Sequence, residues 1–176
     1  MTDVLALCGR AFVFGDEISA DVMAPGRYLK LSPPELAAHC LESVDPTFAA
    51  NVQQGDIIVA GRNFGLGSSR EQAAESLRLL GIRAIIAKSF ARIFYRNAIN
   101  LGLVALRCAE AGEIADRDII RVDAGAGRIE NLTASCTHAA EPLPPHVVAI
   151  IRDGGLIPHL KKRLARPSIP ADPRAS

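Results

Sequence analysis

The sequence lacks an excess of charge of either sign. It contains 20 lysine and arginine residues against 19 aspartate and glutamate residues, which gives a formal net charge of +1. A protein with so little net charge has no global field that would steer it to nucleic acid or to an acidic membrane surface. Any anion that this chain binds must therefore be held by a local arrangement of residues.

Long apolar runs are also missing. No stretch approaches the length that crosses a membrane, and the first residues, MTDVLALCGRAF, lack the basic and apolar segments of a secretory signal. The basic cluster at residues 161–163 is short and has no aromatic neighbours, which is typical of a solvated helix end. We expect a soluble, cytoplasmic protein with neither a membrane nor a nucleic acid among its partners.

The cysteines and histidines do not form the patterns of a metal or redox site. Cys8, Cys40, Cys108 and Cys136 lie far apart, with no CxxC pair and no histidine at zinc-finger spacing. They predict four reduced thiols in or near the core and no metal site in this chain. Structural or surface positions are expected for the histidines, which are His39, His138, His146 and His159.

What the sequence does contain is an alternation of short apolar runs and helical patterns. With 176 residues, 49% of them hydrophobic, the chain fits one compact domain, placed at residues 1–165, and a disordered tail at 166–176. Strands are expected at residues 4–14, 56–60, 84–87 and 103–106, and helices at 33–43 with Ser32 as cap, 69–80, and 89–100 with Ser89 as cap. This order implies parallel strands joined by right-handed crossovers.

The pattern of apolar and polar residues changes after residue 109. Residues 118–122 and 128–132 flank a Gly-Ala-Gly turn and predict a hairpin of more exposed strands. A short helix at 146–152 and a last amphipathic turn or two at 155–164 complete the expected elements. Parallel and antiparallel strands together predict an α/β fold with a mixed sheet.

One Gly-rich stretch, residues 61–73 (GRNFGLGSSREQA), joins an expected buried strand to an expected helix. Gly65 and Gly67 permit backbone angles that let successive amide hydrogens converge on one point ahead of the helix. These N–H groups and the helix dipole favour a carboxylate or a phosphate there, and Arg70 can form a bidentate pair with either. The stretch is therefore a candidate anion site.

The stretch does not match two known nucleotide-binding patterns. It lacks the lysine of a phosphate-binding P-loop, and Arg70 occupies the place of the third glycine in a dinucleotide fingerprint. A structural alternative stays open, in which Ser68 is an N-cap and Glu71 completes a capping box. Against it stands the redundancy of the cluster, because a cap needs one hydroxyl whereas Ser68, Ser69 and Arg70 arrive together. Cations and oriented amides would also make a serine hydroxyl a better base.

Two long motifs give the chain a resemblance to a known family. Residues 63–103 (NFGLGSSREQAAESLRLLGIRAIIAKSFARIFYRNAINLGL) resemble the swivel domain of the aconitase superfamily, particularly the separate small subunits of 3-isopropylmalate dehydratases. Residues 9–29 (GRAFVFGDEISADVMAPGRYL) resemble the opening segment of that family, and the likeness fades after Cys108. The resemblance implies a swivelling domain with β/β/α layers around a mixed sheet.

The resemblance also implies a partner and a reaction. In the family, a large subunit carries a [4Fe-4S] cluster on three cysteines; this chain lacks that cysteine pattern, so no cofactor is expected in it. Ser68 matches the general base, and Ser69 and Arg70 match the residues that bind the substrate carboxylate. The implied reaction is the isomerisation of a hydroxy acid by dehydration and rehydration, as in leucine biosynthesis.

Four further residues are assigned through the resemblance. Lys30 and Leu31 match a loop that contacts the variable group of the substrate, where relatives carry apolar residues for isopropylmalate or an arginine for homoaconitate-type acids. Lys30 departs from both patterns, since its ammonium can pair with a third carboxylate or extend away and leave Leu31 against an alkyl group. Asp21 matches an orienting aspartate, or is a turn former, and Gln72 replaces a common histidine as a supporting group.

The sequence therefore leaves three candidate functions open. The first is a small subunit of a two-chain hydro-lyase that acts on isopropylmalate. The second is the same subunit with a homoaconitase-like or dimethylmalate-type substrate. The third belongs to another class, because helix N-termini bind anions without catalysing anything: a stand-alone module that binds a carboxylate or phosphate.

Overall fold

The computed structural model describes residues 6–165. Its elements follow in the order β1 (Ala6–Val13), α1 (Ala20–Met23), η1 (Gly26–Tyr28), α2 (Pro33–Ala37), α3 (Phe48–Asn51), β2 (Ile57–Ala60), α4 (Glu71–Leu79), β3 (Ala84–Ala87), α5 (Arg92–Asn100), β4 (Val104–Arg107), η2 (Ala111–Glu113), β5 (Ile119–Asp123), β6 (Arg128–Asn131), β7 (Cys136–Ala139), α6 (Pro145–Arg152) and α7 (Leu156–Leu164). The predicted tail at 166–176 lies outside the described residues, so the domain boundary at 165 stays a prediction.

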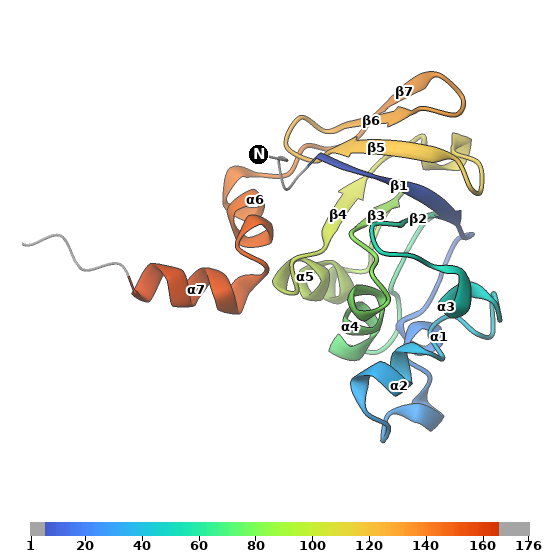
Figure 1. Ribbon diagram of the computed structural model, residues 1–176, viewed down its shortest axis with the longest axis vertical. Coiled ribbons are helices and arrows are strands. Elements are labelled where there is room, and N and C mark those ends of the chain that lie inside the picture. The colour runs from blue at the N-terminus through green and yellow to red at the C-terminus, as the bar shows by residue number, and fades with distance from the viewer. Residues whose placement is uncertain (1–5, 166–176) are drawn as a thin grey trace, which may run out of the picture.

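One mixed sheet of seven strands organises the fold, in the order β4-β3-β2-β1-β5-β6-β7. Strands β1 to β4 pair in parallel, and β5, β6 and β7 continue the sheet from β1 as an antiparallel meander. In Figure 1 this meander crosses the top of the molecule, α4 and α5 lie below it beside the parallel strands, and α7 extends away from the body. The α/β class and the mixed sheet are confirmed.

Burial explains why the parallel half could be predicted closely. All four residues of β2 and of β3 are buried, as expected of parallel strands covered on both faces. Helix α4 turns Ala73, Ala74 and Leu77 into the core, and α5 contributes Phe94 and Ala98. The predicted strand at 84–87 is confirmed to the residue. The predicted strand at 56–60 begins one residue before β2, and the one at 103–106 is shifted by one residue from β4.

Several helix starts differ from the predictions. The helix predicted from residue 69 begins at Glu71, because Arg70 keeps an extended backbone with ψ of 111°. The helix predicted from Ser89 begins at Arg92; Ser89 is not its cap, since its hydroxyl accepts a hydrogen bond from the Asn63 amide. Ser32 does begin α2 with a capping box, but regular helix stops at Ala37 and turns continue to residue 44.

The sequence patterns missed five short elements. They are α1, η1, α3, η2 and the edge strand β7, each of three or four residues, too short for a periodic pattern to show. The predicted hairpin is confirmed by the pairing of β5 with β6, and the last amphipathic segment forms the nine-residue helix α7. Among residues 6–165, no helix has the length and apolar character needed to span a membrane.

The cysteine prediction is partly wrong. All four thiols are free, but only Cys40 and Cys108 are buried, while Cys8 and Cys136 are exposed on strands β1 and β7. Burial raises the pKa of both Cys40 and Cys108 above its usual range, so these two thiols stay protonated.

Candidate functional site

The Gly-rich turn lies where the carboxyl ends of two parallel strands meet. Residues 61–70 follow β2, and backbone hydrogen bonds join them to a neighbouring segment on each of two sides. On one side the Ala20 amide donates to the Leu66 carbonyl at 2.8 Å, and on the other the Ala91 amide donates to the Phe64 carbonyl at 2.9 Å. The turn is thereby held between the start of α1 and the start of α5, at the edge where open α/β sheets bind ligands.

Two glycines of the turn are required by close approach. A Cβ on Gly61 would lie 1.9 Å from Oδ1 of Asp16, and a Cβ on Gly65, whose φ is +83°, would lie 2.1 Å from Cγ of Phe94. Asp16 also accepts hydrogen bonds from the backbone and side chain of Arg62, which hold the pKa of its carboxyl below the usual range. The path of the turn is thus fixed by contacts at Gly61 and at Gly65.

Three side chains meet at the start of α4. Asp21 of α1 accepts a hydrogen bond from Oγ of Ser68 at 2.8 Å and pairs with Nη1 of Arg70 at 2.6 Å, through the same oxygen, Oδ1. Nη1 of Arg70 also donates to the Ala24 carbonyl at 3.1 Å. One carboxylate oxygen therefore holds together the hydroxyl and the guanidinium that the sequence placed side by side.

This geometry decides against the capping box. The residue that precedes α4 is Arg70, and no side chain caps the helix there. The Ser68 hydroxyl donates its hydrogen bond to Asp21, and Ser68 lies two residues before the position that a cap would occupy. Because the amides at the start of α4 have no side-chain cap, they remain available to an anion.

A cavity of about 640 Å³ opens beside the turn. The backbone of Gly65 and Gly67 forms one side, and α5 contributes Arg92, Ile93 and Arg96 to the other. Ile93 is 43% exposed there, and neither arginine forms an ion pair with the described residues. Helix α5 begins at this cavity, with Ala91 and Arg92 among the lining residues, so the N-terminal end of its dipole and the two arginines favour an anionic ligand there.

The sequence analysis missed Arg92 and Arg96. Their spacing of four residues at the start of the helix after β3 was the available signal, since the ends of adjacent parallel strands meet at one edge.

The remaining predicted site residues lie nearby but are not joined to the cluster. Ser69 and Gln72 are exposed on either side of Arg70, and Lys30 and Leu31 lie on an exposed turn after η1. A Cβ on Gly26, at the start of η1, would lie 3.6 Å from Nη2 of Arg70. The segment that leads to Lys30 and Leu31 therefore begins next to the guanidinium. Within residues 6–165, no hydrogen bond or ion pair links Lys30 to Ser68 or Arg70.

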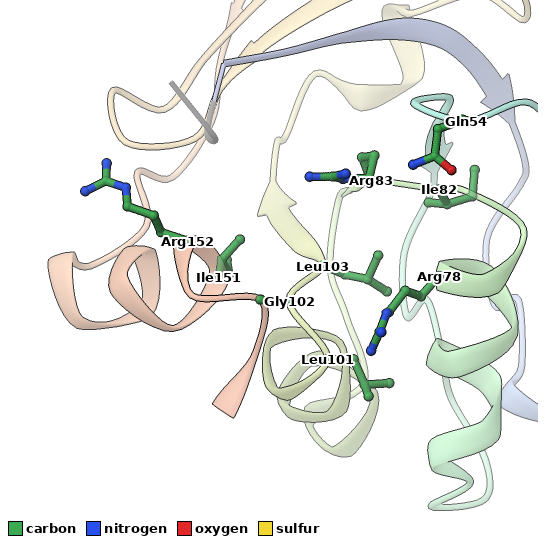
Figure 2. A pocket seen from close by; sticks show the side chains of 10 residues that line it. Gln54, Arg78, Ile82, Arg83, Leu101, Gly102, Leu103, Ile151 and Arg152 are labelled. Atoms are coloured by element: carbon green, nitrogen blue, oxygen red, sulfur yellow. The ribbon is translucent and has the colours of Figure 1, made fainter. Parts of the chain in front are cut away.

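A second pocket, of about 300 Å³, lies at the opposite ends of the same helices. Figure 2 shows Arg78, from the last turn of α4, beside Leu101 and Leu103, which follow α5, with Arg83 above them. Because α4 is nine residues long, it separates this pocket from the Gly-rich turn by roughly 13 Å. The pocket is therefore not part of the Ser68 cluster.

The thiols of this chain do not fit an iron–sulfur cluster. Such a cluster takes several thiolates at one point, whereas Cys40 and Cys108 are buried and Cys8 and Cys136 are exposed on strands at different places in the sheet. In the described part of the chain, the candidate ligands that lie together in a group of three are Glu110, Glu113 and His138.

Comparisons with known proteins agree with this architecture. Residues 23–111 match the family model of the aconitase C-terminal domain. A 3-isopropylmalate dehydratase small subunit of Moorella thermoacetica is 48% identical over 158 residues, which cover 89% of this chain and 95% of that protein. A methanogen homoaconitase small subunit of Methanothermobacter thermautotrophicus is also 48% identical, over 89% of this chain and 91% of that protein.

A solved structure extends the likeness to three dimensions. The crystal structure of a 3-isopropylmalate dehydratase from Methanocaldococcus jannaschii matches with a TM-score of 0.86 and 46% identity, covering 90% of this chain and 95% of that one. The chain therefore belongs to the aconitase C-terminal domain family, among the small subunits of 3-isopropylmalate dehydratase and its relatives.

Proposed function

We propose that this chain is the small subunit of a two-chain hydro-lyase that interconverts 2-isopropylmalate and 3-isopropylmalate by dehydration and rehydration. The observation that carries the proposal is the meeting of Ser68, Arg70 and Asp21 at the uncapped start of α4, beside a cavity with two arginines that form no ion pair among residues 6–165. The cytoplasm is the proposed compartment, in keeping with four free thiols.

Arg70 is the proposed anchor for a carboxylate of the substrate. Its recorded contacts, to Asp21 and Ala24, are both made by Nη1, and 27% of the side chain is exposed. The planar guanidinium therefore keeps N–H donors that can face a carboxylate from the cavity side. The exposed hydroxyl of Ser69 is placed to add a further hydrogen bond to the same carboxylate.

Ser68 is the proposed base. Its O–H bond is directed to Asp21, so the lone pairs of Oγ remain free to accept a proton from the substrate carbon beside the carboxylate. As that C–H bond breaks and its electrons form the double bond, Oγ gains a proton, and its own proton can move along the hydrogen bond to Asp21. Arg70, which contacts the same Asp21 oxygen, holds the Asp21 carboxylate in position to receive this proton.

The leaving hydroxyl requires chemistry that this chain does not supply. We place the [4Fe-4S] cluster on a large subunit, because the thiols described above do not come together. Such a cluster, when bound, supplies a Lewis acid for the departing hydroxyl. The residues of this chain hold the substrate carboxylate, move the proton and close the site from one side.

Lys30 and Leu31 are the proposed contacts to the variable group of the substrate. Leu31 is 40% exposed and offers an apolar surface for an isopropyl group, whereas the Lys30 ammonium has no recorded partner in residues 6–165. We favour isopropylmalate, with Lys30 extended into solvent. A homoaconitase-type acid with a third carboxylate is the alternative, in which Lys30 turns inward to pair with it.

The experiment combines this chain with a 3-isopropylmalate dehydratase large subunit that holds its cluster. The isolated chain should be inactive, and the mixture should isomerise isopropylmalate. Because loss of a general base costs about 10²- to 10⁴-fold in rate, Ser68→Ala should lower kcat by that factor while the melting temperature stays unchanged. Ser43→Ala, at an exposed serine away from the turn, is the matched control and should leave kcat unchanged.

Near-full turnover of the Ser68→Ala complex would contradict the role of Ser68. Calorimetry on the isolated chain tests the other function class, since tight binding of a dicarboxylate without any partner would favour a stand-alone anion-binding module.

A further inference from the structure

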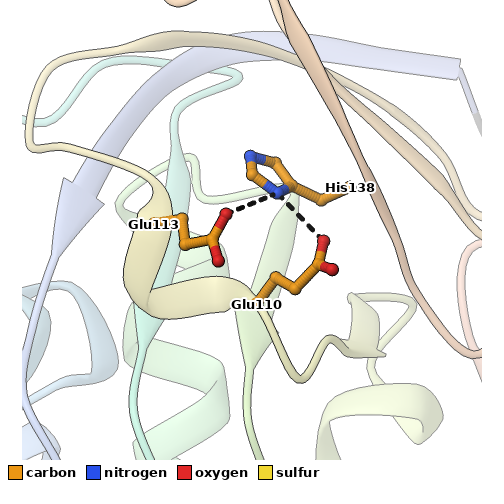
Figure 3. A group of neighbouring side chains, drawn as sticks. All are labelled: Glu110, Glu113 and His138. Atoms are coloured by element: carbon orange, nitrogen blue, oxygen red, sulfur yellow. Dashed lines mark hydrogen bonds and ion pairs between the residues drawn. The ribbon is translucent and has the colours of Figure 1, made fainter.

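A group of three potential metal ligands lies outside the Gly-rich turn. Glu110 precedes the 3-10 turn η2, which follows β4, and Glu113 is the last residue of that turn; His138 lies on strand β7 at the far edge of the sheet. Figure 3 shows the imidazole of His138 directed at both carboxylates. The His138 side chain is only 4% exposed, while those of Glu110 and Glu113 are 51% and 68% exposed. The group is thus reached from solvent on its carboxylate side.

The spacing of the donor atoms suits a small divalent cation. Nδ1 of His138 lies 3.2 Å from a Glu110 oxygen and 3.8 Å from a Glu113 oxygen, and all three donor atoms are within 4.8 Å of one another. Zinc binds nitrogen and oxygen at distances that place the donors of a tetrahedron about 3.4 Å apart. Small rotations of two exposed glutamate side chains would close the difference.

An ordinary ion pair does not account for both carboxylates. A single N–H at Nδ1 can be donated along one line, and at 3.8 Å the Glu113 oxygen is beyond hydrogen-bond distance. No lysine or arginine of residues 6–165 forms an ion pair with either glutamate, although the Lys88 ammonium approaches Gly112 of the same turn. The two carboxylates bring like charges together, which a divalent cation between them would neutralise.

The second ring nitrogen of His138 also has a side-chain contact, to a thiol. Nε2 of His138 lies 3.5 Å from Sγ of Cys136, its neighbour two positions earlier on the same face of β7. When Nδ1 binds a metal, Nε2 carries the proton and can donate it to this sulfur, which fixes the orientation of the ring. The ring is thereby aimed at the carboxylates by a contact on its opposite edge.

We infer that Glu110, Glu113 and His138 form a binding site for a divalent transition metal, with zinc the best fit. Two carboxylate oxygens and one imidazole nitrogen are a ligand set that zinc accepts, with water in the fourth position. The ion would join η2, at the end of the parallel strands, to the edge strand β7. Its role is structural, and the site is independent of the Ser68 cluster and of the proposed reaction.

Calorimetric titration of the untagged full chain, freed of metal by a chelator, tests the site with Zn²⁺ as the probe. We expect one ion per chain and a rise in melting temperature on binding. Glu113→Gln should weaken binding at least about tenfold, since even the partners of metal ligands contribute that much. This exposed side chain can be changed without disturbing the fold, so the test does not depend on His138→Asn, which could unfold β7.

Two controls sharpen the result. His146→Asn removes an exposed histidine at the start of α6 and should leave zinc affinity unchanged. Cys136→Ser should retain binding, because the sulfur faces Nε2 and not the metal position. The absence of saturable zinc binding to the wild-type chain, an unchanged affinity in Glu113→Gln, or complete loss of binding in Cys136→Ser would each overturn the assignment.

Discussion

The parallel and antiparallel halves of the sheet place their polar groups in different ways. In the parallel half, β2 and β3 are buried throughout and carry no polar side chain, so the hydroxyls and charges of the Ser68 cluster lie in the loop after β2. In the antiparallel half, β5 and β6 alternate exposed and buried residues, and polar groups sit within the strands, as in the pair of Arg121 with Glu130 at 3.0 Å. A site in the parallel half therefore leaves a continuous motif in the sequence, whereas a site in the antiparallel half is scattered.

The largest expected difference between the halves is in packing. Ile86 of β3 is fully buried, so Ile86→Ala should cost about 4 kcal/mol in the free energy of unfolding through lost burial and a cavity. Ile119 of β5 is 38% exposed, so the same truncation there should cost less than about 1 kcal/mol. Urea unfolding of both variants measures the contrast, and equal losses would show that the two halves are packed alike.

A smaller effect is expected from the shape of the Gly-rich turn. Gly65→Ala forces a Cβ into the ring of Phe94 at a positive φ, which should cost about 3 kcal/mol and displace Ser68. Gly15→Ala is the matched control, because an added Cβ meets nothing within 4 Å there. Thermal unfolding and turnover in the two-chain complex report the two consequences. If Gly65→Ala behaved like Gly15→Ala, the contact with Phe94 would not shape the turn.

The smallest effect concerns the junction of β1 with the start of β2, where Asp56 holds β1, the strand that both halves share. Asp56 is 4% exposed and accepts hydrogen bonds from Nη2 of Arg10 at 2.7 Å and from the Gln53 amide at 2.8 Å. Burial raises the pKa of Asp56, but these hydrogen bonds and the Arg10 charge outweigh it, so the pKa lies below its usual range. Asp56→Asn should therefore cost about 2 kcal/mol at neutral pH.

The pH dependence of this junction follows from the sign of that shift. A carboxylate with a depressed pKa stabilises the folded state above its unfolded pKa of about 3.9, and the contribution is lost as the pH falls through the folded value. Urea unfolding from pH 7 to pH 3 should show the wild-type chain losing stability while Asp56→Asn loses less. Parallel curves for the two proteins would mean that Asp56 does not link folding to pH.

The sequence predicted the parts of the molecule in which one local pattern decides the outcome. The strand at 84–87 is correct because four consecutive apolar residues suit only a buried strand. The start of α4 was placed two residues early, because tertiary contacts of Ser68 and Arg70 with Asp21 keep that segment extended. Strand β7 was missed because three of its four residues are exposed and no apolar alternation marks an edge strand.

The candidate site was predictable to a similar extent. The Gly-rich turn follows from its motif, but the contact of Asp21 with Ser68 joins residues from separate elements, which composition and spacing do not reveal. Arg92 and Arg96 reach the same cavity only because β2 and β3 are adjacent in the sheet. For the same reason, no local spacing could indicate that Glu110 and His138 meet.

The central place of β1 has a consequence for how the chain folds. This first strand pairs on one side with β2, through Ala11 and Ile57, and on the other side with β5, through Cys8 and Arg121. Neither neighbour has been synthesised when β1 leaves the ribosome, so both of its edges stay open until much later segments arrive. Contacts of such long sequence separation slow folding and prolong the exposure of unpaired strand edges. Nascent chains should therefore depend most on chaperone protection before residue 121 emerges.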